Sequence, residues 1–202
     1  MKTLLHVVLL LFSVFALAQD EHSCVHINKI IRIPDSLNEL EIRIYKRYSI
    51  TNGTEVFRMY QVNKDLWRAE FYEYYSAVPS ANVKEHFTKR ELQALEDIEL
   101  TWYKILVQNI LYLPSEDAIA YKFQPKSIEC DERSDSYTYW IRRGSFLDGT
   151  SFKISIRDMD KKNIIVYSNP DSYLKRYPGV DELISVHELL EIICNNFGVW
   201  KE

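Results

Sequence analysis

Residues 41–75 read EIRIYKRYSITNGTEVFRMYQVNKDLWRAEFYEYY. Polar breaks at 51–54 (TNGT) and 63–65 (NKD) divide this stretch into three runs in which apolar and polar side chains alternate. Alternation with a period of two is typical of half-buried strands. Asn-Gly between two such runs indicates a type I′ hairpin turn, because both residues tolerate a positive φ. The stretch therefore predicts an antiparallel meander with strands at 41–48, 55–62 and 66–75.

The C-terminal half suggests the same plan, with strands expected at 137–143, 151–158 and 163–167. Residues 46–54 (KRYSITNGT) align with residues 142–150 (RRGSFLDGT), and the Arg, Ser, Gly and Thr positions coincide. This match predicts an internal duplication whose halves span about 40–112 and 136–198. Chance is the alternative, because hairpin turns often carry Asn-Gly or Asp-Gly beside polar residues.

A long helix is expected at the end of each half. Thr88 and Glu91 match a capping box, and apolar residues then recur at helical spacing, which predicts a helix over 89–112. The second helix is expected over 181–197, with Gly198 as its C-cap. The sequence therefore predicts a single α+β domain. It has an antiparallel sheet of about six strands from two β-β-β-α halves, and two long helices pack on one face.

The strands also predict two chemically different sheet faces. Apolar residues are expected to face the helices: Ile42, Ile44, Ala69, Phe71, Ile154 and Ile156. The opposite face is expected to be open and rich in tyrosine and arginine, and its proposed ligand-binding residues are Arg43, Tyr45, Arg47, Arg68, Tyr72, Tyr74 and Arg157. Tyrosine and arginine are enriched in binding hot spots. The structural alternative is that Tyr–Arg cross-strand pairs only stabilise an exposed sheet.

The N-terminus has the features of a cleavable signal peptide over residues 1–18. Lys2 is followed by an apolar run from Leu4 to Leu17, and Ala16-Leu17-Ala18 supplies small residues for cleavage. The apolar run is shorter than the roughly 20 residues that span a bilayer. The mature chain, residues 19–202, is therefore expected to be a single domain in the periplasm or the cell exterior, without a transmembrane segment.

Three cysteines follow the predicted cleavage site: Cys24, Cys130 and Cys194. In an oxidising compartment, three cysteines favour one disulfide and one thiol. Cys24 and Cys130 lie in polar stretches, so the sequence favours a Cys24–Cys130 disulfide, and Cys24–Cys194 is the next alternative.

No catalytic motif is present. His187-Glu188-Leu189-Leu190-Glu191 resembles the His-Glu-x-x-His zinc motif, but Glu191 replaces the second histidine and no histidine follows it. We therefore expect a charged helix surface, with no catalytic residue, metal or cofactor. A formal net charge of −4 gives no reason to expect nucleic-acid binding.

These features favour a non-catalytic binding module of the periplasm or cell exterior. Its expected partner is a protein or a polymer of the cell envelope, bound on the Tyr/Arg-rich sheet face. The alternative is a hydrolytic enzyme whose site is assembled from residues distant in sequence.

Overall fold

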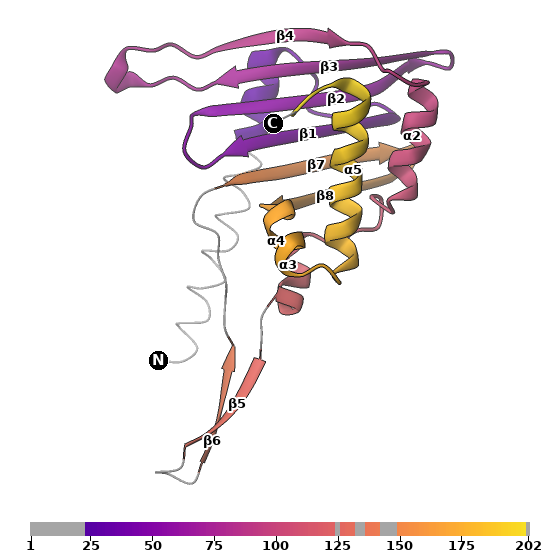
Figure 1. Cartoon of the computed structure of the whole chain (residues 1–202). Helices are drawn as coiled ribbons and strands as arrows, with labels where there is room; N and C mark the ends of the chain where they lie inside the picture. The colour runs from indigo at the N-terminus through magenta and orange to yellow at the C-terminus, as the bar shows by residue number, and fades with distance from the viewer. Residues whose placement is uncertain (1–22, 124–125, 132–135, 142–148, 201–202) are drawn as a thin grey trace.

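The computed structural model describes residues 23–123, 126–131, 136–141 and 149–200. A six-stranded antiparallel sheet forms the centre of the molecule, in the order β4-β3-β2-β1-β7-β8 (Figure 1). Its strands are β1 (Leu40–Tyr48), β2 (Gly53–Asn63), β3 (Leu66–Tyr75), β4 (His86–Leu92), β7 (Thr150–Asp158) and β8 (Lys161–Ser168). The structure confirms the predicted α+β class and the antiparallel sheet.

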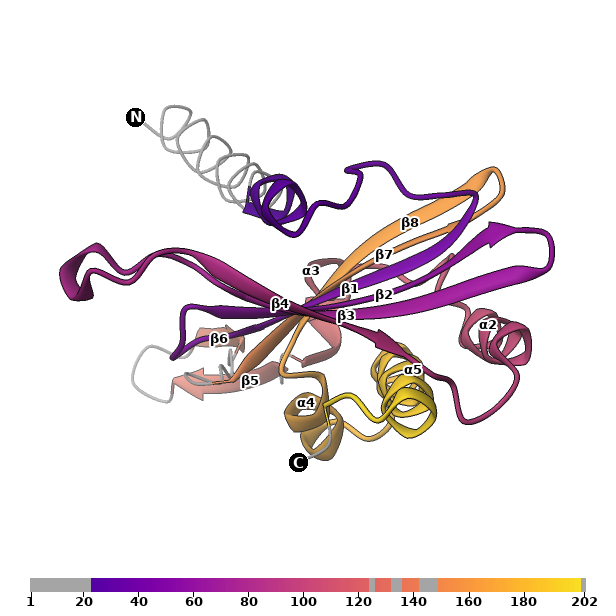
Figure 2. The same cartoon turned by 90° about the horizontal axis from the view of Figure 1, so that it is seen from above.

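Helices α2 (Ile98–Val107), α4 (Pro170–Arg176) and α5 (Asp181–Phe197) lie on one face of this sheet (Figures 1 and 2). The short elements are α3 (Glu116–Ile119) and the 3-10 turns η1 (Pro79–Ala81) and η2 (Ala120–Phe123). Within the described residues, no helix is long and apolar enough to cross a membrane.

The predicted meander is confirmed as β1, β2 and β3, but its first turn differs from the prediction. Residues 49–52 connect β1 to β2, and neither Asn52 nor Gly53 has a positive φ, so this is not a type I′ turn. Instead, the Asn52 side chain donates to the Ser76 carbonyl oxygen at 2.7 Å. A Cβ atom at Gly53 would lie 3.3 Å from the Tyr75 ring, so Gly53 permits a close approach between neighbouring strands.

The predicted helix over 89–112 is wrong in its first part, because residues 86–92 form the edge strand β4. Thr88 donates to the carboxylate of Glu73 on β3 at 2.9 Å and does not cap a helix. Helix α2 begins later, where the Asp97 carboxylate accepts a hydrogen bond from the Leu100 backbone N–H at 2.8 Å. The capping-box pattern of four residues therefore also fitted an exposed edge strand.

The C-terminal half contributes only β7 and β8 to the main sheet. The predicted strand near 137–143 is present as β6 (Ser136–Ile141), but it pairs with β5 (Lys126–Asp131) in a separate hairpin that projects from the domain (Figure 1). The main sheet thus takes four strands from the N-terminal half and two from the C-terminal half. Residues 142–148 of the proposed repeat lie outside the described residues, so the duplication stays a prediction.

The main core lies between the sheet and its helices. All six residues predicted to face the helices are buried there. Helix α5 has the predicted bounds, and its C-cap Gly198 has the predicted left-handed conformation, with φ 64°. The buried side of α5 presents apolar residues at helical spacing, including Leu183, Val186, Leu190 and Phe197.

Candidate functional site

The Tyr/Arg face of the sheet is largely covered. Residues 23–31 form a helix, here called the covering helix, on the side of the sheet opposite α2 and α5 (Figure 2). Its Cys24, Ile27 and Ile31 form a second hydrophobic core with sheet residues that include Tyr45, Tyr72 and Tyr74. The expectation of an open face is therefore wrong for most of this surface, because the apolar side of the covering helix needed a sheet to pack against.

The seven predicted ligand-binding residues fall into two groups. Arg43, Tyr45, Tyr72 and Tyr74 are buried. The Tyr45 hydroxyl donates to Asn28 of the covering helix at 2.6 Å. The remaining three, Arg68, Arg47 and Arg157, reach the surface at least in part.

Two of the arginines that reach the surface, Arg47 and Arg157, donate hydrogen bonds to different neighbours. Arg47 donates to Ser23 at 3.1 Å and to the Cys24 sulfur at 3.2 Å. Arg157 donates to the carbonyl oxygens of Met159 and Leu37, at 2.8 and 3.2 Å. The structure thus places all seven residues on one face but does not bring them together in one accessible site.

A network of buried charges lies on the same face. The Glu41 carboxylate accepts hydrogen bonds from Arg43 (2.5 and 3.1 Å), Arg58 (2.8 and 3.1 Å) and the Asn38 backbone N–H (2.9 Å). Arg58 also reaches Glu70 at 3.4 Å. Glu41, Arg58 and Glu70 were not among the predicted site residues. The alternation of the strands could have placed Glu41 beside Arg43 and Glu70 beside Tyr72 on this face.

The network keeps its carboxylates ionised. Burial by itself raises the pKa of Glu41, but the hydrogen bond from Arg58 and the charges of Arg43 and Arg58 bring that pKa below its usual value. Burial also acts to raise the pKa of Glu70, but hydrogen bonds from Lys89 and Tyr72 outweigh this effect, so the pKa of Glu70 is below its usual value. Each buried charge therefore has an oppositely charged partner, and removal of one partner would leave another charge buried without compensation.

A polar hollow lies on the helix side, at the end of the sheet that α5 leaves uncovered. We call it the sheet-end cleft; its volume is about 470 Å³. Lys46, Glu55 and Glu73 are direct neighbours across β1, β2 and β3 and form its floor. Its other polar and aromatic lining comes from Tyr48, Arg90, Phe152, Asp171, His187, Glu191 and Trp200.

The cations of the cleft rest on aromatic rings. The Lys46 ammonium lies 5.0 Å from the ring centre of Tyr48, 5.8 Å from that of Phe152 and 5.9 Å from that of Trp200. The Arg90 guanidinium carbon lies 4.9 Å from the ring centre of Phe71. Such contacts are cation–π interactions. Neither cation forms an ion pair with an acidic residue in the described part of the chain.

The carboxylates of the floor accept hydrogen bonds from neutral hydroxyl groups. Glu55 accepts from Tyr48 at 2.9 Å, and Glu73 accepts from Thr88 at 2.9 Å. Burial and the bond to Glu55 raise the pKa of Tyr48, so its hydroxyl stays a donor. Among the described residues, no cation forms an ion pair with either carboxylate, so the cleft presents charges of both signs that are close neighbours but are not joined in ion pairs.

A histidine–aspartate pair stands at the wall of the cleft. His187 Nδ1 lies 2.7 Å from Asp171 Oδ1, with the two side chains 39% and 57% exposed. Of the residues that resembled a zinc motif, His187, Leu190 and Glu191 line the cleft, whereas Glu188 lines a neighbouring groove that Glu191 also borders. Within the described residues, no three histidine, cysteine or acidic side chains lie close enough to hold one metal ion.

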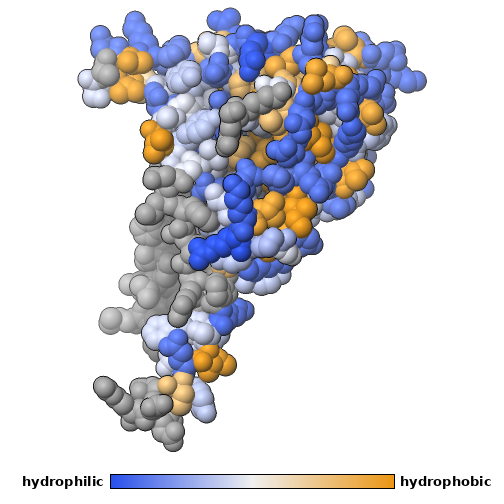
Figure 3. Space-filling model, in the orientation of Figure 1, coloured by the Kyte–Doolittle hydropathy of each residue, from blue (hydrophilic) through white to orange (hydrophobic). Residues whose placement is uncertain are grey.

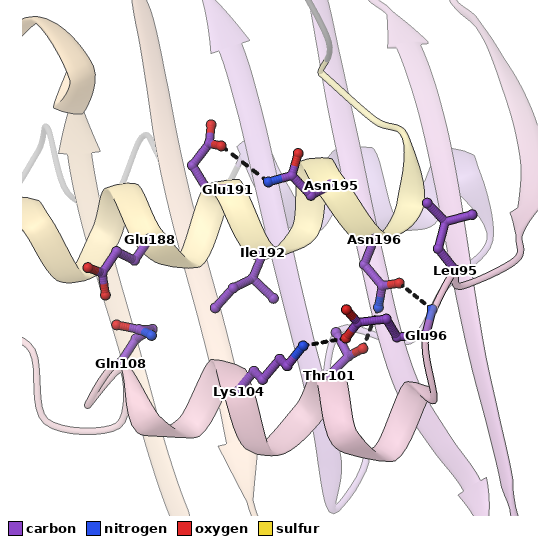
Figure 4. Close-up of a pocket in the computed structure, with 10 residues that line it drawn as sticks. All are labelled: Leu95, Glu96, Thr101, Lys104, Gln108, Glu188, Glu191, Ile192, Asn195 and Asn196. Carbon is purple, nitrogen blue, oxygen red and sulfur yellow. Dashed lines mark hydrogen bonds and ion pairs between the residues drawn. The ribbon is translucent and has the colours of Figure 1, made fainter.

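The groove beside Glu188 separates α2 from α5 and measures about 460 Å³ (Figure 4). Its polar groups are largely satisfied from within: Lys104 pairs with Glu96, while Asn196 contacts Thr101 and accepts from the Glu96 backbone N–H at 2.8 Å. The contacts of Asn196 therefore connect α5 to α2 and to the segment before it. Elsewhere on this side of the molecule, hydrophobic residues lie in small groups between hydrophilic ones (Figure 3).

The predicted Cys24–Cys130 disulfide is not formed in the structure, and no cysteine in the described part of the chain is disulfide-bonded. Cys24 is 5% exposed within the second core, whereas Cys130 is exposed on the projecting β5–β6 hairpin. The predicted signal peptide, residues 1–18, lies outside the described residues. Comparisons with protein-family models, curated proteins and solved structures found no match to this chain.

Proposed function

We propose that this chain is a binding protein that acts outside the cytosol and holds a small ligand with both a positive and a negative group in the sheet-end cleft. The observation that carries the proposal is that cations and carboxylates line the same cleft without forming ion pairs with one another. Lys46 and Arg90 are available to a ligand anion, and Glu55 and Glu73 to a ligand cation. The location rests on the predicted signal peptide, residues 1–18.

The aromatic lining supports this ligand class. Tyr48, Phe152 and Trp200 surround the Lys46 ammonium, so part of its hydration shell is already replaced by rings. A ligand carboxylate that pairs with Lys46 would meet a less hydrated cation than one at an open surface. Ligand pockets typically combine such apolar walls with a few converging polar groups. A free amino acid or a short peptide belongs to this ligand class.

The cleft replaces the Tyr/Arg face as the proposed recognition surface. Four of the seven residues expected to bind on that face are buried under the covering helix or within the charge network. The floor of the cleft is the part of the sheet that α5 leaves accessible, so a ligand can enter without displacing an element.

The test is calorimetric titration of the mature chain with leucine, leucine methyl ester and N-acetyl-leucine, extended to dipeptides that differ in the same way. We expect the zwitterions to bind and the two blocked forms to bind at least tenfold more weakly, because each lacks one charge. Glu73→Gln should selectively remove the preference for the free amine, and Lys46→Met the preference for the free carboxylate.

Lys64→Ala, at an exposed turn lysine, is the matched control and should bind as the wild type does. Equal affinity for the zwitterions and their blocked forms would refute the proposal. So would wild-type behaviour of both cleft variants.

A hydrolytic enzyme is the second candidate, favoured by the His187–Asp171 pair. A carboxylate on one imidazole nitrogen orients the ring and leaves the other nitrogen to act as a base. In addition, Glu55 and Glu73 are direct cross-strand neighbours, a placement that puts Cβ atoms about 4.5–5.5 Å apart. Turnover of nitrophenyl esters or glycosides that is lost in His187→Ala or Glu73→Gln would support this candidate.

A further inference from the structure

A second hollow lies on the other side of the sheet, between β7–β8 and residues 23–39. It measures about 250 Å³, and we call it the β7–β8 hollow. The lining residues that matter here are Asp35, Tyr45, Lys153, Ser155, Lys162 and Ile164. It is a part of the Tyr/Arg face beside the covering helix. Figure 2 shows this helix on the side of the sheet opposite α5, which contributes to the sheet-end cleft.

Ser155 has an unused hydroxyl in this hollow. The residue is only 9% exposed, yet its hydroxyl makes no hydrogen bond to the described residues. The hydroxyl is not among the buried side-chain atoms that lack a partner, so it is accessible from the hollow that the residue lines. It is therefore a donor available to a ligand acceptor.

The charge around the hollow is positive, although the whole chain carries a formal net charge of −4. The charged residues of its lining are Arg43, Lys153, Lys162 and Asp35, and Arg43 is already paired with Glu41. Lys153 and Lys162 line the hollow, and neither forms an ion pair with a described acidic residue. This asymmetry favours an anionic ligand.

Asp35 is the acidic residue of the lining, and its carboxylate already accepts a hydrogen bond from Asn28 at 3.0 Å. The apolar part of the hollow includes Ile164, the direct cross-strand neighbour of Ser155, which is 58% exposed. An anion bound at Ser155 would therefore have an apolar surface beside it that an inorganic ion cannot use.

We propose that the β7–β8 hollow binds a small organic anion, a carboxylate or phosphate monoester that carries a short apolar group. The Ser155 hydroxyl donates to the anion, Lys153 and Lys162 balance its charge, and the apolar group covers Ile164. The volume of the hollow restricts the ligand to one smaller than a typical drug-sized molecule. This site is independent of the sheet-end cleft.

The experiment is calorimetric titration of the mature chain with phenyl phosphate, benzoate and inorganic phosphate. We expect phenyl phosphate or benzoate to bind at least fivefold more tightly than inorganic phosphate, because only they cover Ile164. Loss of a hydrogen bond to a charged group in Ser155→Ala should weaken binding about tenfold or more. Lys162→Ala should weaken binding and flatten its dependence on salt.

Lys64→Ala is the matched lysine control, and Glu73→Gln in the sheet-end cleft should leave the titration unchanged. Circular dichroism spectra that match the wild type show that each variant is folded; Ser155→Thr, which keeps the hydroxyl, should retain binding if Ser155→Ala loses it. Absence of binding by the wild type at 10 mM probe would overturn the proposal. Binding that is unchanged in both Ser155→Ala and Lys162→Ala would also overturn it.

Discussion

Replacement of Glu41 by glutamine tests the buried charge network most directly. Glu41 is fully buried and lies between two arginines that are 1% and 7% exposed. Glutamine has nearly the same volume but no charge, and its amide nitrogen cannot accept a hydrogen bond. At least one guanidinium therefore loses its bonds to this side chain, while both lose the countercharge.

The expected cost is about 3–5 kcal/mol of unfolding free energy, the range found when one partner of a buried ion pair is removed. Loss of two hydrogen bonds to a charged group, at about 1.5–3 kcal/mol each, gives a similar figure. With a urea m-value of about 2 kcal/mol/M, the midpoint of urea unfolding should fall by roughly 1.5–2.5 M. Glu39→Gln, an exposed neighbour, is the matched control and should stay within about 0.5 kcal/mol of the wild type.

The pH dependence gives an independent check. The pKa values of Glu41 and Glu70 are lowered in the folded protein. The stabilisation is therefore complete above the unfolded glutamate pKa of about 4.3, and it is lost as the pH falls through the lower folded values. Urea unfolding between pH 7 and pH 3 should show a smaller loss of stability on acidification in Glu41→Gln than in the wild type. If Glu41→Gln lowered the unfolding free energy by less than about 1 kcal/mol at pH 7, the argument that the buried network depends on the Glu41 charge would be refuted.

Three further predictions concern local elements. Asp97→Ala removes the N-cap of α2 and should lower the unfolding free energy by about 0.5–2 kcal/mol in urea titration, whereas an unchanged midpoint would show that the cap contributes nothing. Ile27→Asp places a charge in the second core, so hydrogen exchange in the covering helix should accelerate while the amides of α5 stay protected; equal acceleration in both would contradict a locally docked helix. The exposed Cys130 thiol should react with a maleimide in the native protein, whereas the buried Cys24 should react only after unfolding. Mass spectrometry of the labelled peptides measures both reactions. An unreactive Cys130 would contradict the structure, and the same spectra would then identify a Cys24–Cys130 disulfide.

Local sequence patterns determined much of the sheet. The alternation over 41–75 predicts β1, β2 and β3, and the apolar spacing over 181–197 predicts α5 with its glycine C-cap. These patterns succeed because strand and helix periodicity are local properties of consecutive residues. The predicted split into core-facing and opposite-facing residues on the strands is also correct, since it follows from the same period of two.

Tertiary structure decided the rest. Residues 86–92 match a helix start in sequence but form strand β4, because their backbone pairs with the edge of β3. Thr88 and Lys89 add side-chain hydrogen bonds to Glu73 and Glu70 on that strand. The Tyr/Arg face is covered because the helix at 23–31, just before β1, carries apolar residues that pack on Tyr45, Tyr72 and Tyr74. The sheet-end cleft gathers side chains from five strands, two helices and the C-terminal segment. The chemistry at each site depends on which segments of the chain come into contact, and the local periodicity of a sequence does not determine those contacts.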